Sequence, residues 1–165
     1  MKKYEFTGET KEIRLLFRTA TLHRIRATVA FGIVEVGDLG GWIEKEENLS
    51  HEGKAWVWGN AEVCGDAEVW GNAKVCGDAE VFSASHVLVI GAIGSRNDFT
   101  TFYRDKDNEI TVKCGCFLGK IDRFLEKVTQ THGDSKYALV YRAAVEVAKL
   151  QIDLSGEAPK DADEE

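Results

Sequence analysis

The middle of the chain repeats with a period of six residues. From Ala55 to Val87 the sequence runs AWVWGN, AEVCGD, AEVWGN, AKVCGD, AEVFSA and SHV. Six valines keep the same register, namely Val57, Val63, Val69, Val75, Val81 and Val87. This period is neither that of an α-helix nor the plain alternation of one strand, and it is too short for a helical repeat. It favours a parallel β-helix built from short strands that tight turns connect.

Each position of the six-residue unit has an expected role. The small residue that opens a unit and the valine two places later point the same way, because side chains alternate along a strand, so we expect both to face the interior. The Gly-Asn and Gly-Asp pairs would form the corners, since these residues tolerate the positive φ of a tight turn. Three corners would close a triangular coil, and residues eighteen apart would then stack about 4.8 Å from each other.

The repeat resembles the hexapeptide-repeat superfamily, in which an aliphatic residue is followed four places later by a small one. Val57 to Ala61 and Val63 to Ala67 show this pattern, and three further pairs continue it. The resemblance implies a short left-handed parallel β-helix, which the repeat predicts to have about three coils. We expect a mainly β chain with an N-terminal β cap (1–37), the β-helix (38–94), a β-hairpin plus two helices (95–152) and a disordered acidic tail (153–165).

The segments on either side of the repeat predict the cap and the ββαα appendage. KYEFTG and TLHRIRATVAFGIVEV are typical of strands, which would cover the open end of the β-helix and its unpaired backbone groups. FTTFYRDKDNEITVKCGCF predicts a hairpin that turns between Asp105 and Asn108. Two amphipathic helices should follow, the first ending near His132 and the second running from Asp134 or Ser135 to about Gln151.

Apart from its tail, the whole chain also resembles a group of short proteins carried by phages and mobile elements of low-GC Gram-positive bacteria. Beside the repeat, the segments KKYEFTGET, TLHRIRA, GDLGGWIEKEENLS, IGSRNDFTTFYR and CGCFLGKIDRFLEKVTQTHGD carry this resemblance. It implies a phage or mobile-element source and no particular chemistry.

Charge changes this picture only slightly. The formal net charge is -7, and most acidic residues lie in residues 37–94 and in the tail, whereas the segments on either side of 37–94 are mildly basic. We expect the flanks to pack against the acidic β-helix, and nucleic-acid binding remains the less favoured alternative. No apolar run follows Lys2 and Lys3, and no stretch reaches membrane-spanning length. We therefore expect a cytoplasmic protein without membrane contact.

The four cysteines do not predict a metal site. Cys64 and Cys76 are two units apart, which would place them on different faces of the coil. Cys114 and Cys116 have an i, i+2 spacing that is tighter than in structural zinc sites. Reduced, packed thiols are expected in a cytosolic protein, and we predict no metal and no cofactor.

Large apolar residues occupy positions that would face outward from the coil. They are Trp56, Trp58, Trp70, Phe82 and Leu88. Exposed contiguous apolar surface usually marks a contact surface. Either the flanking segments cover these residues, or the chain forms a homodimer or homotrimer through them.

Many hexapeptide-repeat proteins are trimeric acyl-CoA-dependent acyltransferases with a catalytic histidine, and the resemblance makes His51 and His86 the candidates here. Glu68 would stack beside His86 and could orient it as a base. An ordinary surface ion pair explains that pair better. The repeat is also short for a cofactor cleft and lacks a protruding loop, so we expect no catalytic residue.

Arginines gather at both ends of the repeat. Arg14, Arg18, Arg24 and Arg26 precede it, and Arg96 and Arg104 follow it. With nearby aromatic rings, such arginines suit a phosphate, a nucleotide messenger or nucleic acid. Pairing with acidic residues of the chain itself, such as Glu5, is the simpler alternative and the favoured one.

Taken together, these features favour a non-catalytic binding protein, expressed from a phage in the host cytoplasm. It would bind and inhibit a host factor, as an anti-CRISPR-type or other anti-defence protein does, or would sequester a nucleotide signal. An acyl-CoA-dependent acyltransferase is the first alternative, and a structural phage component is the second.

Overall fold

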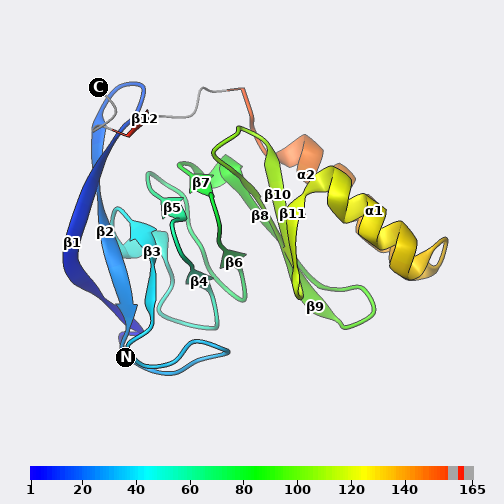
Figure 1. The fold of residues 1–165 in the computed structure, drawn as a ribbon, viewed down its shortest axis with the longest axis horizontal. Coiled ribbons are helices and arrows are strands. Elements are labelled where there is room, and N and C mark those ends of the chain that lie inside the picture. Colours follow the sequence, from blue (N-terminus) through cyan, green and yellow to red (C-terminus); the bar gives the residue numbers. More distant parts are fainter. Residues whose placement is uncertain (156–159, 162–165) are drawn as a thin grey trace.

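The computed structural model describes residues 1–155 and 160–161, and the fold is mainly β (Figure 1). The first half contains β1 (Tyr4–Arg14), β2 (Thr19–Ala27), β3 (Leu39–Ile43), the 3-10 helix η1 (Glu46–Asn48), β4 (Trp56–Val57), β5 (Glu62–Val63), β6 (Lys74–Val75) and β7 (Glu80–Val81). The second half contains the 3-10 helix η2 (Ala84–His86), β8 (Val87–Ile93), β9 (Asp98–Arg104), β10 (Ile110–Cys114), β11 (Phe117–Lys120), α1 (Ile121–His132), α2 (Lys136–Gln151) and β12 (Lys160–Asp161).

The predicted fold class is wrong, because the chain does not form a left-handed parallel β-helix of three coils. The strands of the described residues instead belong to three open sheets. A six-stranded mixed sheet has the order β12-β1-β2-β3-β5-β7, a four-stranded antiparallel sheet has the order β11-β10-β9-β8, and β4 pairs with β6 alone. The flanking segments therefore contribute most of the sheet structure.

The repeat itself supplies only strands of two residues. Two parallel pairs join residues eighteen apart, as predicted: Trp56 lies opposite Lys74, and Glu62 lies opposite Glu80. Val69 forms no strand and makes only an isolated parallel bridge to Leu49. The last unit leaves the repeat altogether, because Val87 begins β8, which is antiparallel to β9. We call residues 55–82, which contain the two parallel pairs, the hexad ladder.

In the first five units, both positions expected to face the interior are buried, whereas Ser85 and Val87 of the last unit are only partly buried. The alanines and valines involved are at most 1% exposed: Ala55, Ala61, Ala67, Ala73, Ala79, Val57, Val63, Val69, Val75 and Val81. They form the first hydrophobic core together with Ile25, Ile43 and Leu49. The four corner glycines, Gly59, Gly65, Gly71 and Gly77, have the predicted positive φ. The predicted burial and turns within the units are thus confirmed, but the predicted assembly of the units into a β-helix is not.

The N-terminal segment extends the mixed sheet from the ladder outward. β1 and β2 form an antiparallel pair whose register shifts between Phe6 and Thr10, and β2 then pairs with β3. β3 continues in parallel to β5, with Trp42 opposite Glu62. The segment thereby covers the edge that β5 would otherwise expose to unwanted strand pairing.

The predicted hairpin and helices form the C-terminal half, with one correction. β9 and β10 pair antiparallel as expected, but β8 and β11 add to their two sides and complete a four-stranded sheet. The helices α1 and α2 follow the predicted bounds closely. Figure 1 shows them on the side of this sheet that faces away from the hexad ladder. Phe102 and Val112 of the sheet pack there with Phe124 and Val145 of the helices in a second core.

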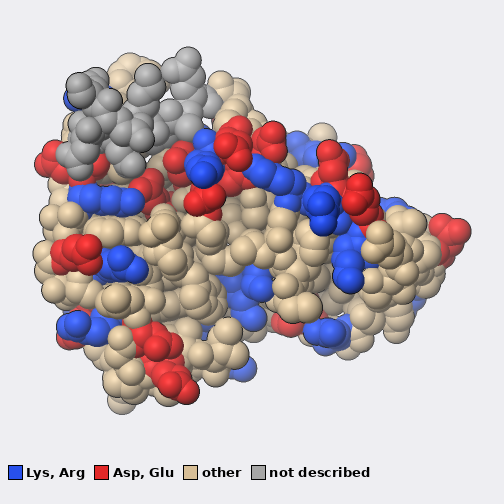
Figure 2. Space-filling model, viewed as in Figure 1, with Lys and Arg blue, Asp and Glu red and all other residues tan. Residues whose placement is uncertain are grey.

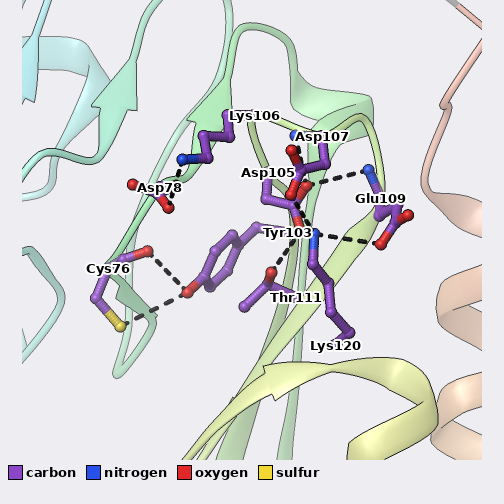
Figure 3. A network of polar contacts seen from close by, with 9 residues as sticks. All are labelled: Cys76, Asp78, Tyr103, Asp105, Lys106, Asp107, Glu109, Thr111 and Lys120. Atoms are coloured by element: carbon purple, nitrogen blue, oxygen red, sulfur yellow. Dashed lines mark hydrogen bonds and ion pairs between the residues drawn. The ribbon is translucent and has the colours of Figure 1, made fainter.

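The end of β9 joins the four-stranded sheet to the hexad ladder (Figure 3). The Tyr103 hydroxyl donates to the carbonyl oxygen of Cys76 at 2.9 Å, and the Arg104 Nε donates to that of Glu80 at 2.9 Å. The backbone N–H of Lys106 donates to the carbonyl of Asp78, also at 2.9 Å. Successive residues of β9 and its turn thus satisfy backbone groups at the last edge of the ladder.

A buried carboxylate holds the turn that follows β9. Asp105 is 3% exposed, and its Oδ1 accepts the backbone N–H groups of Asp107 and Glu109 at 2.9 and 3.2 Å. Its Oδ2 accepts the hydroxyl of Thr111 at 2.6 Å and the Nζ of Lys120 at 2.7 Å. Four donors compensate for the burial of this charge, which fixes the turn between β9 and β10.

The predicted disordered tail at 153–165 lies mostly outside the described residues. Of its later part, Lys160 and Asp161 pair with Arg14 and Ile13 of β1. Among the described helices, none is both long and apolar enough to cross a membrane.

The corner glycines provide a test of this packing. Gly59 and Gly65 have φ values of +58° and +65°, but a Cβ at Gly65 would lie 2.4 Å from the Phe82 carbonyl oxygen, whereas one at Gly59 meets no atom within 4 Å. We expect Gly59→Ala to lower the free energy of unfolding by about 1–2 kcal/mol, the cost of a left-handed conformation. Gly65→Ala should cost roughly twice that or more, because backbone must also move. Urea unfolding of both variants measures the difference, and equal losses would contradict the packing described.

Candidate functional site

A cleft of about 600 Å³ is lined by residues of three separate parts of the chain. The hexad ladder contributes Trp58, Lys74 and Cys76, the loop before β3 contributes Ile33, and the end of the β10–β11 hairpin contributes Lys113, Gly115 and Cys116. We call it the junction cleft, because it lies where the ladder meets the four-stranded sheet. Its size falls within the ordinary range of small-molecule sites, which is about 300–1,000 Å³.

The charge of the junction cleft differs from that of the whole chain. Two lysines line it and, among the described residues, no aspartate or glutamate does, although the chain has a net charge of -7. The Lys113 Nζ donates to the carbonyl oxygen of Gly115 at 2.7 Å. The Lys74 Nζ forms no hydrogen bond or ion pair within the part of the chain that the structure describes. The cleft therefore offers an unneutralised cation to an anionic ligand.

The remaining walls of the cleft are apolar. Trp58 is partly buried and packs against the first core, which holds its ring in place while leaving part of it accessible. Cys76 is buried, and its Sγ lies 3.6 Å from the hydroxyl of Tyr103. Ile33 is largely exposed at the mouth, and Cys116 is exposed beside it. A partly buried indole and a free ammonium group in one cleft suit a ligand with a planar ring and a negative charge.

The residues predicted to form an apolar outer surface lie in different places. Trp56 is fully buried, because the N-terminal segment covers it: its ring lies edge-on to those of Tyr4 at 6.3 Å and Phe31 at 5.3 Å. Phe82 is partly buried, with the Arg104 guanidinium 4.9 Å above its ring. The flanking segments therefore cover both rings, which is one of the two alternatives that the sequence left open.

Of the other predicted surface residues, Leu88 packs against the second core and Trp58 lines the junction cleft. Trp70 alone of the five remains open, with 64% of its surface exposed. The structure therefore does not gather these residues on one face.

The predicted arginine cluster is also dispersed, and most of its members pair within the chain. Arg18 forms two hydrogen bonds with Glu44, and Arg26 pairs with Glu5 at 2.9 Å. On the face drawn in Figure 2, basic and acidic side chains lie next to one another instead of forming a patch of one sign. These observations agree with the simpler alternative of intramolecular pairing.

The other arginines have individual surroundings. Arg24 donates to the carbonyl oxygen of Gly40 at 3.2 Å and lies over the ring of Trp42. Arg14 ends β1 and pairs with Lys160 through the strand register. Arg104 is 2% exposed, and Arg96 lines a second, smaller cavity.

The two candidate histidines accept backbone hydrogen bonds. The Nδ1 of His86 accepts the N–H of Phe82 at 3.1 Å, and burial, together with the nearby Arg104, lowers the pKa of His86 to about 4. Glu68 is exposed, and no hydrogen bond or ion pair joins it to His86 in the described part of the chain. The Nδ1 of His51 accepts the N–H of Lys3 at 3.0 Å, and its ring stacks on Tyr4.

Two of the four cysteines, Cys64 and Cys76, are buried thiols. Burial raises the pKa of the Cys64 thiol to about 12, and it also raises the pKa of the Cys76 thiol. Both thiols are therefore protonated near neutral pH. Among the described residues, no three His, Cys, Asp or Glu side chains lie close enough together to hold a metal ion.

Sequence reasoning missed both lysines of the junction cleft. Lys74 did carry a signal, because it replaces the Glu that follows the small residue in three other units of the repeat. Lys113 carried none, since a lysine on the polar side of a predicted strand is unremarkable until the fold brings it near the ladder.

No protein-family model matches this chain, and no curated protein matches it. The interpretation of the site therefore depends on its geometry and charge.

The surroundings of His86 predict a pH dependence of stability. Protonation of its Nδ1 would break the bond from Phe82, and the pKa is about 4 in the folded chain against 6.5 ordinarily. Between these values the unfolded chain binds the extra proton, so stability present above pH 6.5 is lost as the pH falls towards 4. Because the ring is partly solvated, we expect the free energy of unfolding to fall by about 1–2 kcal/mol, which is less than the pKa difference would give for a fully buried ring.

The variant His86→Asn isolates this effect, because its Oδ1 can still accept the Phe82 N–H while it cannot titrate. Urea unfolding at a series of pH values should show a smaller decline for the variant than for the wild type over this window. Parallel stability profiles for the two proteins would contradict the assignment.

Proposed function

We propose that this chain is a non-catalytic binding protein, encoded by a phage or mobile element, that acts in the host cytoplasm by binding a host factor and thereby inhibiting a defence response. We further propose that the factor is a nucleotide signal, which the protein sequesters in the junction cleft. The observation that carries this proposal is the combination of Trp58 and Lys74 in a cleft that no acidic side chain of the described residues lines.

A nucleotide matches this cleft in both of its chemical parts. Its phosphate would meet the free ammonium of Lys74 and that of Lys113, which can exchange the Gly115 carbonyl for a phosphate oxygen. Its base would stack on Trp58, an interaction worth about 1–3 kcal/mol in single-stranded nucleic-acid binding. The walls provide few hydrogen-bonding groups for one particular base, so we expect modest base selectivity.

We propose a non-catalytic role because of the surroundings of the two candidate histidines. His51 and His86 each use Nδ1 to accept a backbone N–H, and neither lines the junction cleft. The alternative of an acyl-CoA-dependent acyltransferase needs a base beside the bound thioester, and this arrangement does not favour it. Coenzyme A contains a nucleotide, however, so acetyl-CoA belongs in any binding test.

The proposal extends to self-association, for which Trp70 is the supporting residue. Its indole is 64% exposed on the hexad ladder, and large exposed aromatic residues are enriched in protein interfaces. We propose that the chain forms a homo-oligomer through the surface around this residue.

Calorimetric and thermal-shift titrations with linear nucleotides, cyclic mononucleotides, cyclic dinucleotides and acetyl-CoA test the sequestration proposal. A nucleotide that binds should stabilise the protein by ~2.7 kcal/mol at a hundred times its dissociation constant. It should also slow alkylation of Cys116, because this exposed thiol borders the cleft.

Two variants assign the binding to the cleft. Lys74→Gln and Trp58→Ala should each weaken binding about tenfold, since each removes one charged or stacking contact. Lys54→Gln is the matched control, because Lys54 is an exposed lysine that directly precedes the ladder and does not line the cleft. Absence of binding across the panel, or equal affinity in all three variants, would refute the proposal, and turnover of acetyl-CoA would support the acyltransferase instead.

Light scattering tests the self-association proposal. The wild type should have a solution mass of at least two chains, and Trp70→Ser should reduce it to one while leaving the far-UV circular dichroism spectrum unchanged, since this side chain is mostly outside the core. A monomeric wild type, or an oligomer that the substitution leaves intact, would count against it.

A further inference from the structure

A second cavity, of about 170 Å³, lies between α1, α2 and the end of the four-stranded sheet. Its floor is formed by Phe117, Phe124, Val128 and Tyr141, which belong to the second core. We call it the helix pocket. It shares only Gly115 and Cys116 with the junction cleft, so the two sites can be occupied and tested separately.

The floor of the helix pocket is aromatic and well ordered by packing. The ring of Phe124 lies edge-on to that of Tyr141, with centroids 5.7 Å apart and planes at 87°, and 5.4 Å from that of Phe117. Gly94 permits this arrangement, because a Cβ there would come within 1.8 Å of the Tyr141 hydroxyl. Rings fixed in this way present both edges and faces to an incoming aromatic group.

The rim of the helix pocket carries positive charge. Arg96 and Lys127 are exposed at it, and neither forms an ion pair or hydrogen bond with the residues that the structure describes. Asp98 is the one acidic residue of the lining, and its Oδ1 accepts the N–H of Phe99 at 2.7 Å. Two unpaired cations thus stand above an apolar floor.

Size and charge together select the ligand class. An apolar protein cavity of about 150 Å³ holds a single benzene ring, and the helix pocket, at about 170 Å³, matches the size of one ring. A guanidinium group binds a carboxylate through two parallel hydrogen bonds, and a nearby ammonium group adds to the attraction. We propose that the helix pocket binds a small monoaromatic carboxylate, with the ring on Phe124 and Tyr141 and the carboxylate at Arg96 and Lys127.

Ligand-observed NMR and calorimetry with phenylacetate test this proposal, and benzyl alcohol serves as its uncharged counterpart. Phenylacetate should bind the wild type at least tenfold more tightly than benzyl alcohol, because only the former can pair with the rim. Arg96→Gln should weaken phenylacetate binding about tenfold. Its effect on benzyl alcohol should be small.

A second variant keeps the two cations of the rim and fills the volume of the helix pocket. Thr131→Trp, at an exposed position of α1 that lines the pocket, should fill it and abolish binding of both compounds. Arg123→Gln is the matched control, because Arg123 lies on the same helix, is exposed and does not line the pocket. The proposal is overturned if phenylacetate does not bind, if it binds no better than benzyl alcohol, or if Arg96→Gln and Thr131→Trp behave like the control.

Discussion

The structure depends on satisfying the backbone of strands that are too short to be stable alone. A two-residue strand makes few hydrogen bonds, and its outer edge would leave N–H and C=O groups unpaired. Longer strands from the flanking segments solve this problem on both sides of the hexad ladder. On one side β3 pairs with the ladder, and the N–H of Trp42 donates to the carbonyl of Ala61 at 3.0 Å. On the other side Tyr103, Arg104 and Lys106, at the end of β9 and in its turn, donate to backbone carbonyls of the ladder.

This constraint also creates the candidate site. The four-stranded sheet must approach the ladder closely enough for Tyr103 to reach the carbonyl of Cys76. At that approach the hairpin end carrying Lys113 and Cys116 comes to line the same cleft as Trp58 and Lys74. The two lysines therefore share a cavity as a consequence of how the ladder edge is closed, and the acidic residues of the repeat stay outside its lining.

The two hydrophobic cores keep the two cavities chemically distinct. The first core holds the ladder and supports Trp58, whereas the second lies between the four-stranded sheet and the helices and provides the floor of the helix pocket. Only the turn at Gly115 and Cys116 belongs to both linings. A wide cleft with a stacking platform and a narrow pocket with an aromatic floor consequently suit ligands of different size.

The sequence alone determined the features that depend on near neighbours and on a strict period. It predicted the buried alanines and valines from alternation, the positive φ at Gly65 and its equivalents from turn chemistry, and both helices from their apolar period. The pairing of Trp56 with Lys74 followed from the regular spacing of three units. Only the tertiary structure decided how these pieces assemble. The strands of the N- and C-terminal segments pair with the ladder and complete open sheets, so a β-helix of three coils does not form. Trp56 is covered by Tyr4 and Phe31, and Lys74 and Lys113 come to line one cleft. A repeat specifies which faces are apolar, but the partner that buries each face comes from distant parts of the chain, and that choice depends on the total packing and hydrogen bonding of the folded molecule.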